Sequence, residues 1–399
     1  MNDTTDTVPI RLGLAPEPRP HRGRAGLAGL VIVVLVAVIA GGGWYLYDTT
    51  FAAPDFEGPG EGPAVVQVAE GATTRQIGTE LARGGVVASV EAFLRAAEEE
   101  PRIRTVQPGY YRMRERMSAA AAVALLLDPA ARVGRLEIRG GMQLDDTTGG
   151  DGSVAPGVLT LISRASCAGA AAAPTCVSVD ELRTAMAETD PAQLGVPEWA
   201  LAPVRAADAG RRLEGLLAPG LYDVAPDTGG GVDGAAEILR SLLEVSTARF
   251  AASNLVAGAE AAGLTPYEAL TAASLVEKEA ITADMPKVAR VIYNRLDVGQ
   301  RLELDSTVNY PLDRQTLRTT AEDRSRVGPY NSYAVAGLPP TPIAAPGQAA
   351  IAAALEPADG PWLFFVRCEP DGTSCFATTL AEHDENIATA IANGAFGGS

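Results

Sequence analysis

Two glutamates separated by one lysine, Glu277 and Glu279, have the clearest catalytic potential in this sequence. Successive helical residues turn by about 100°, so Glu279 shares a face with Leu275 and Val276. Glu277 points to the other side, and the two carboxylates therefore cannot flank one glycosidic bond as an acid and base pair. A single carboxyl beside apolar side chains keeps its proton to higher pH, which favours Glu279 as a general acid. Two solvated charges on a helix surface are the alternative interpretation.

Amide, hydroxyl and aromatic side chains follow these glutamates in the segments 302–310 and 329–347. Aromatic faces stack on sugar rings, and amides and hydroxyls form hydrogen bonds with sugar hydroxyls. The proline-rich second segment is stiff, which favours a binding loop for a saccharide. A structural turn without ligand contacts is the alternative.

The elements that position these residues are two helices and a strand. The first helix is predicted to begin after Thr265, with Pro266 in its first turn and Glu268 completing a capping box. The second is predicted over 287–299, with Gly299 as its C-terminal cap. Alternation in RLELDSTVNY predicts a strand over 301–310 that leads to Asp305.

Composition excludes several classes of function. Only two histidines occur, His21 and His383, so the commonest zinc sites are excluded, and no nucleophile elbow accompanies His383. The net charge of −17 argues against a nucleic-acid partner. No metal and no cofactor is expected.

The apolar segment 25–47 is predicted to span a membrane as one helix. Arginines precede it and acids follow it, which places the N-terminus in the cytoplasm and the rest of the chain outside the plasma membrane. A cleaved signal peptide is the alternative, but the apolar stretch is long and no A-x-A site closes it.

Four cysteines form two local pairs, Cys167 with Cys176 and Cys368 with Cys375. An oxidising compartment would let both pairs close as disulfides, although three pairings are formally possible. A turn at 370–372 would set Cys368 opposite Cys375 in a hairpin. A four-thiolate zinc site is the alternative, but the C-x2-C spacing is missing.

The expected fold class is α+β, with an N-terminal transmembrane helix, a small module and a larger catalytic domain. The predicted boundaries are a disordered cytoplasmic tail at 1–24, the span at 25–47, a linker at 48–63, a small α+β module at 64–134, a connecting region at 135–210 and the catalytic domain at 211–394.

The larger domain resembles the endolytic murein transglycosylase family, the YceG-like proteins. The resemblance rests on several stretches in order: LEGLLAPGLY (213–222), ASLVEKEA (273–280), VARVIYNRL (288–296), LELDSTV (302–308), YNSYAVAGLPPTPIAAPG (330–347), and Phe376, Thr378, Glu382 and His383. The small module is similar to the LysM-like module of that family. The chain departs from the family pattern at Ser306, where proline is common. It also departs at residues 145–205, which are interpreted as an insertion that decorates the surface between the domains.

The resemblance implies a membrane-anchored lyase that cuts peptidoglycan strands between MurNAc and GlcNAc, leaves 1,6-anhydro ends and terminates nascent strands. It implies Glu279 as the catalytic residue and a substrate-binding set of Glu277, Asn294, Asp305, Ser306, Tyr310, Tyr330, Asn331, Tyr333 and Pro339. Peptidoglycan synthases are expected partners. A hydrolase of the same bond, with Asp305 activating water, and a non-catalytic peptidoglycan-binding scaffold are the alternatives.

Overall fold

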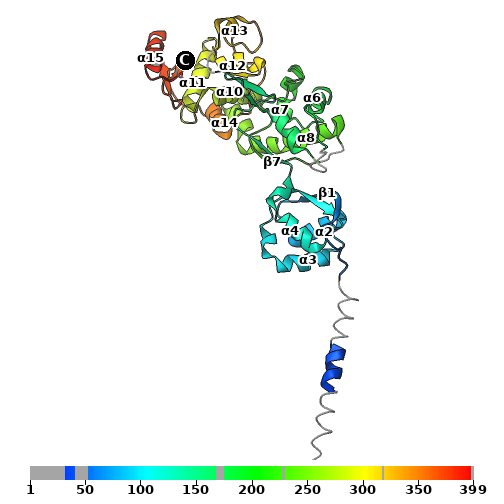
Figure 1. Cartoon of the computed structure of the whole chain (residues 1–399). Coiled ribbons are helices and arrows are strands. Elements are labelled where there is room, and N and C mark those ends of the chain that lie inside the picture. The colour runs from blue at the N-terminus through cyan, green and yellow to red at the C-terminus, as the bar shows by residue number, and fades with distance from the viewer. Residues whose placement is uncertain (1–31, 41–52, 168–174, 227–229, 317–318, 397–399) are drawn as a thin grey trace, which may run out of the picture. The chain divides into compact units, whose positions relative to one another are not determined.

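The computed structural model describes residues 32–40, 53–167, 175–226, 230–316 and 319–396 (Figure 1). The chain divides into two compact units, Met1–Pro54 and Asp55–Ser399. A helix covers residues 32–40 of the first unit. Within the described part of the chain, no helix combines the length and the apolar character needed to cross a membrane. Residues 25–31 and 41–47 of the predicted span lie outside the described ranges.

The second unit begins with a small α+β module that has its own hydrophobic core around Leu81, Phe93 and Met113. Three antiparallel strands in the order β1-β2-β3 form its sheet. Its elements are β1 (Glu61–Val68), α2 (Thr74–Arg83), α3 (Val90–Glu99), β2 (Gly109–Glu115), α4 (Ala119–Leu126) and β3 (Arg132–Val133). The ordered module extends into the predicted 48–63 linker, because the Asp55 carboxylate accepts a hydrogen bond from the Ala119 amide.

The region predicted to connect the domains is part of the larger core. Strand β4 (Arg135–Ile138) pairs antiparallel with β7 (Gly220–Asp223). Helices α5 (Val158–Ala165), α6 (Val179–Glu188) and α7 (Glu198–Ala206) bury Leu159, Leu182 and Ala200 in the same apolar cluster as the helix of Glu279. The expectation of a surface insertion at 145–205 is therefore wrong for these helices, because their apolar faces complete the core. Residues 168–174 of this region are not described.

Helix α10 (Pro266–Glu279) crosses the larger domain and is buried from Ala269 to Val276. Thr265 and Glu268 form the predicted capping box, with the Thr265 hydroxyl accepting from the Glu268 amide. Helix α10 packs between neighbours that include α9 (Leu255–Ala261), α11 (Met285–Asp297) and α14 (Gln348–Leu355), while α8 (Gly231–Ala252) packs against α6 and α9. Burial on all sides of α10 fixes the position of its last residue, Glu279.

The strand predicted over 301–310 is wrong. Residues 301–304 are not in a strand, and the helix α12 (Asp305–Asn309) follows them. Glu303 has a φ of 53°, a left-handed conformation that no strand accommodates. Its neighbour Leu304 donates its amide to the Ser332 hydroxyl instead of to a strand partner. The apolar alternation of Leu302 and Leu304 therefore reflects two buried side chains of a turn.

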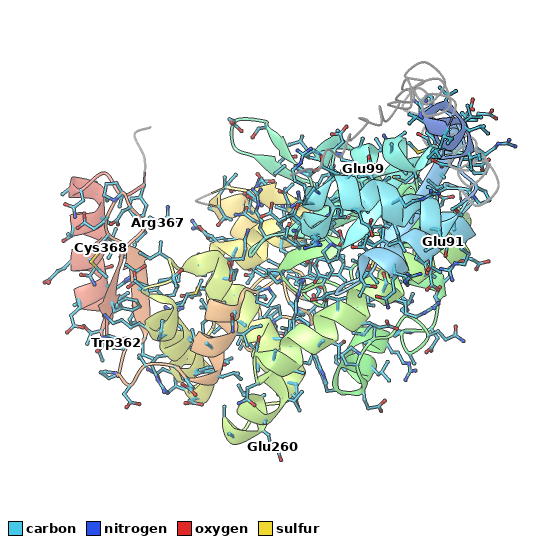
Figure 2. The ribbon with its side chains drawn as sticks, turned by 90° about the horizontal axis from the view of Figure 1, so that it is seen from below. Glu91, Glu99, Glu260, Trp362, Arg367 and Cys368 are labelled. Atoms are coloured by element: carbon cyan, nitrogen blue, oxygen red, sulfur yellow. A yellow bond between two sulfur atoms is a disulfide. The ribbon has the colours of Figure 1, made fainter. Side chains whose placement is uncertain are left out.

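A hairpin and a helix end the described chain: β9 (Phe364–Arg367), β10 (Ser374–Ala377) and α15 (Leu380–Ala392). Figure 2 labels Trp362, Arg367 and Cys368 in this part of the larger domain. Both predicted disulfides are formed, Cys167–Cys176 and Cys368–Cys375. The expected register is wrong, however, because Cys375 lies opposite Val366 and Cys368 lies just beyond the strand. Glu382 caps α15 by accepting from the Thr378 and Thr379 amides.

Candidate active site

The Glu279 carboxyl lies at the C-terminal end of α10 and is sheltered from water. The residue is half-buried, and its Oε1 atom is shielded from solvent and has no hydrogen-bond partner of normal geometry among the described residues. Burial is the largest cause that raises the pKa of Glu279 above its ordinary value. The negative end of the helix macrodipole adds to this preference for the protonated form.

Two residues at the start of α12, Asp305 and Ser306, complete the surroundings of this carboxyl. The Ser306 hydroxyl and amide lower the pKa of Glu279 in part, whereas the negative charge of Asp305 raises it further. The Ser306 Oγ atom is also buried without a partner of normal geometry among the described residues. Buried polar atoms are normally paired. Because Ser306 lowers the pKa of Glu279 as a hydrogen-bond donor, the two oxygens form a weak contact with each other, and no other described group pairs with either of them.

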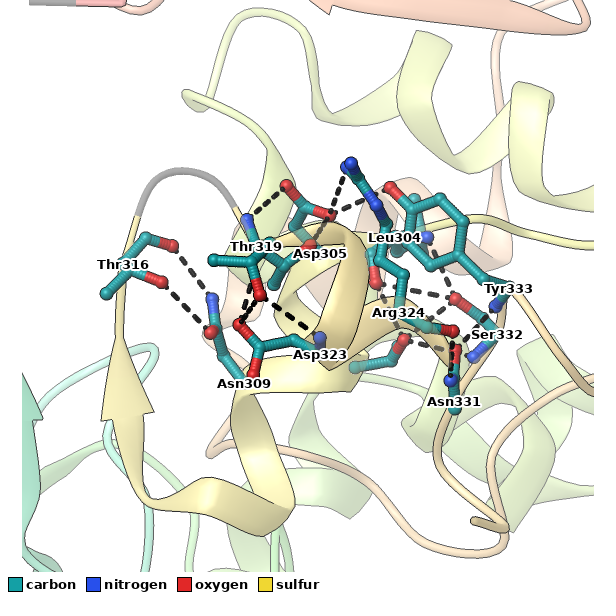
Figure 3. Close-up of polar contacts among 12 residues, drawn as sticks. Leu304, Asp305, Asn309, Thr316, Thr319, Asp323, Arg324, Asn331, Ser332 and Tyr333 are labelled. Carbon is teal, nitrogen blue, oxygen red and sulfur yellow. Dashed lines mark hydrogen bonds and ion pairs between the residues drawn. The ribbon is translucent and has the colours of Figure 1, made fainter. Parts of the chain in front are cut away.

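Asp305 is held rigidly by its neighbours, as Figure 3 shows. Its Oδ1 atom accepts hydrogen bonds from the Tyr333 hydroxyl at 2.8 Å and from the Thr319 hydroxyl at 2.5 Å. Its Oδ2 atom accepts from the Thr319 amide at 3.1 Å, and the Arg324 Nη1 atom lies 4.0 Å from Oδ1. A carboxylate has about four acceptor positions, and the protein fills three of them here. Asp305 therefore acts as a fixed negative charge beside Glu279.

The amide of Asn331 positions Tyr333 (Figure 3). Its nitrogen donates to the carbonyls of Arg324 and Arg326, and its oxygen accepts from the Tyr333 amide at 2.9 Å. Asn331 is thus fully used inside the protein, and Tyr333 carries its hydroxyl to Asp305. The predicted contact of Asn331 with substrate stays a prediction that these bonds do not support.

Tyr310 and Tyr330 pack edge to face, with ring centroids 4.9 Å apart. Tyr310 is 0 % exposed, and its hydroxyl donates to Glu214. Tyr330 is half-buried and bonds to the Thr341 hydroxyl at 3.0 Å. Tyr310 therefore serves the core beside Glu214, and of the two rings Tyr330 is the one that remains partly accessible to a ligand.

Two other predicted binding residues serve the framework. The Asn294 amide donates to the carbonyls of Gly360 and Trp362, which fixes the segment before the C-terminal hairpin. Pro339 is buried. The predicted substrate contacts of both residues stay predictions without support from these surroundings.

Glu277 and Lys278 face a groove of about 940 Å³, whose lining does not include Glu279. The Glu277 Oε2 atom accepts from the Gly347 amide at 2.9 Å, and the Lys278 ammonium donates to the Gly141 carbonyl at 3.3 Å. The side chains of Glu277 and Glu279 thus project from different faces of α10, as helix geometry predicts. We take the surroundings of Glu279 as the candidate catalytic site, because catalysis by proton transfer needs an acid with a raised pKa, and Glu279 is such an acid.

Sequence reasoning missed one buried acid, Glu214, which is 2 % exposed. Burial raises its pKa to about 8, although the Leu144 amide and the Tyr310 hydroxyl donate to its Oε2 atom. The signal was available, because an acid inside the apolar run LEGLL is unusual. Among the described residues, no cluster of three or more His, Cys, Asp or Glu side chains is arranged to hold a metal.

Comparison with known proteins identifies the family. The model of the YceG-like family matches residues 66–389, more than half of the chain. An endolytic murein transglycosylase of Bacillus subtilis is 39 % identical over 120 residues, which cover 30 % of this chain and 33 % of that protein. One of Streptococcus pneumoniae serotype 2 is 31 % identical over 194 residues, which cover 47 % of this chain and 34 % of that protein.

The chain thus spans about a third of the length of these curated relatives. A crystal structure of a yceG-like protein from Listeria monocytogenes shares the fold, with a TM-score of 0.52 and 24 % identity over 81 % of this chain and 98 % of that one. Because the family model covers most of both the small module and the larger domain, this protein belongs to the YceG-like family.

Proposed function

We propose that this chain is a lytic transglycosylase that cuts the bond between MurNAc and GlcNAc inside peptidoglycan strands. The observation that carries the proposal is the sheltered Glu279 carboxyl, which favours its protonated form and has an unpaired oxygen. The names of the curated relatives support the substrate and the reaction class.

One carboxyl group performs both proton transfers in this reaction. Protonated Glu279 donates its proton to the glycosidic oxygen as the bond from that oxygen to C1 of MurNAc breaks. The resulting carboxylate then takes the proton of the C6 hydroxyl of the same sugar, and the C6 oxygen bonds to C1. The products are a free GlcNAc hydroxyl and a 1,6-anhydro-MurNAc end, and no water is consumed.

The neighbours of Glu279 suit this cycle. The Ser306 hydroxyl and amide favour the carboxylate that forms after the first transfer, and the Asp305 charge favours return of the proton. We also assign to the Asp305 charge the role of stabilising the positive charge that develops on the sugar ring. Tyr330 and Tyr333, each half-buried, are the aromatic groups that we assign to sugar contacts.

A hydrolase would need a second group to activate water, and Asp305 is the candidate for that role. Three of its acceptor positions are already used by Thr319 and Tyr333, which leaves little capacity to hold and deprotonate a water molecule. This arrangement favours the intramolecular reaction over hydrolysis.

Digestion of purified sacculi in water enriched with ¹⁸O tests the reaction class. The proposal expects anhydro ends without ¹⁸O in the mass spectra, whereas reducing ends that contain ¹⁸O would establish a hydrolase. Glu279→Gln is expected to abolish cutting while strand binding is retained. Unchanged cell-wall function of this variant in cells would favour the non-catalytic scaffold.

The sequence also bears on the cellular location of this activity. We propose that residues 25–47 anchor the chain in the plasma membrane with the N-terminus inside, so that the second unit lies outside the cell. The two disulfides fit an oxidising compartment. We further propose that the small module binds glycan in the manner of a LysM module, that cutting ends nascent strands, and that peptidoglycan synthases are partners. Single cysteines placed in the tail or in the second unit, and treated in intact cells with a thiol reagent that does not cross the membrane, test the orientation. Only the cysteines in the second unit should be labelled.

A further inference from the structure

The groove beside Glu277 and Lys278 has a charge opposite to that of the chain. The chain carries a net charge of −17, yet six cationic side chains line this groove against three acidic ones. Its walls are β4, the turn 139–143 and the second half of α5, together with residues from β2 and β3. A volume of about 940 Å³ lies near the upper end of the usual range of ligand pockets.

Three of the groove cations form no ion pair and no side-chain hydrogen bond with the described residues: Arg112, Arg135 and Arg164. The others are engaged, since Arg132 pairs with Asp223 and Arg139 pairs with Glu137. Unpaired guanidinium groups are strong, planar donors for carboxylates. Their concentration in one groove of an acidic protein therefore indicates an anionic ligand.

Two buried atoms of the groove point to the same conclusion. The Nε atom of Arg132 and the Oε1 atom of Gln143 are shielded from solvent and have no hydrogen-bond partner among the described residues. Gln143 is 4 % exposed, so an unpaired amide there is costly. A bound group that carries both an acceptor for Arg132 Nε and a donor for Gln143 Oε1 would pair with both atoms.

We propose that this groove binds the peptide stem of the peptidoglycan strand that Glu279 cuts, through the free carboxylates of the stem. The inference rests on the proposed function. Glu277 and Lys278, which line the groove, immediately precede Glu279, so the groove adjoins the point of cutting. The stem is attached to the muramic acid sugar itself and would leave the strand at this point.

The mixture of charges selects peptide over phosphate polymers. Glu137 and Glu277 lie in the groove among the arginines. A stem peptide carries carboxylates together with a free amino group before cross-linking, and it can match both signs. A phosphodiester chain carries negative charge alone and would be repelled by these acids. The enzyme would therefore prefer strands that still carry their stems.

Strand binding by the full chain in the Glu279→Gln background, which prevents turnover, tests the proposal. Soluble glycan strands with stems are compared with the same strands after an amidase has removed the stems. The proposal expects the stem-bearing strands to bind about tenfold more tightly or better, since two charge-assisted contacts are gained. Arg135→Gln combined with Arg164→Gln should remove this difference, and the Lys versions should retain part of it.

Arg367→Gln is the matched control, because Arg367 is an exposed arginine on β9, outside the groove (Figure 2). It should keep the full preference. The inference is overturned if the double variant keeps the preference, or if it loses affinity for both strand types equally. It is also overturned if inorganic phosphate displaces the strands as well as a free stem peptide does. Preference for stems without cutting by the parent chain would defeat the proposed function alone.

Discussion

Two glutamates with solvent-shielded carboxyl oxygens, Glu214 and Glu279, share a raised pKa but differ in their partners. Burial is the main cause in both cases. The Oε2 atom of Glu214 accepts from the Leu144 amide and the Tyr310 hydroxyl, both inside the core. The Oε1 atom of Glu279 has no partner of normal geometry among the described residues. A raised pKa alone therefore does not mark a catalytic acid, whereas an acid with an oxygen not engaged by the core can serve a ligand.

The largest expected effect separates the two glutamates in a cutting assay. Glu279→Gln should lower the rate of release of anhydro products by at least about 10⁴-fold, because in the proposed reaction this one group supplies both proton transfers. Glu214→Gln should stay within about tenfold of the parent, since Gln still accepts from Leu144 and Tyr310. Equal losses of activity in both variants would contradict the assignment of different roles to Glu214 and Glu279.

The second prediction concerns stability and the ionisation of Glu214. Between pH 4.5 and about 8 the unfolded chain has lost this proton while the folded chain retains it. The free energy of unfolding should therefore fall as pH rises through this window, by at most roughly 5 kcal/mol, and level off above it. Glu214→Gln should lack this loss. Urea unfolding of both proteins across the window measures it, and parallel curves would contradict the assignment.

The third prediction concerns the effect of the Asp305 charge on the pKa of Glu279. Asp305→Asn removes a negative charge that raises the pKa of Glu279. The alkaline fall of the cutting rate should therefore move to lower pH. Tyr333→Phe removes the hydrogen bond to Asp305 but keeps its charge, so the fall should stay in place. A shift in the Tyr333→Phe profile alone would show that orientation matters more than charge.

The last prediction concerns the cap of α10, whose loss should lower the stability of the protein without changing the pKa of Glu279. Thr265→Ala removes the N-terminal cap of α10, fourteen residues before the helix ends at Glu279. The unfolding free energy should fall by about 1 kcal/mol. The pH profile of cutting should not change, because no group near the carboxyl is altered. A moved profile would mean that the cap controls the position of Glu279.

Local signals made the helix of Glu279 predictable from the sequence. Thr265, Pro266 and Glu268 act within one turn, so their pattern specifies the start of α10 without knowledge of the rest of the fold. The burial of Glu279 followed from its apolar neighbours on the same helix. The turn before Cys375 was also predictable, because Asp371 and Gly372 are strong turn formers.

The remaining features depend on residues far apart in the sequence. Glu303 takes a left-handed conformation because the chain turns back to Ser332, which an alternating pattern does not reveal. The arginines of the groove come from positions 112 to 164 and meet Lys278 only in the folded chain. Single-sequence periodicity describes one element at a time and therefore predicts neither arrangement.

The ionisation of Glu279 itself is the most direct test of the account. Glutamate labelled with ¹³C at the side-chain carboxyl gives NMR signals that titrate with pH, and subtraction of the Glu279→Gln spectrum identifies the signal of this residue. The account predicts a midpoint well above the ordinary value of 4.5. A midpoint at or below that value would mean that the group is ionised at neutral pH and has no proton to donate.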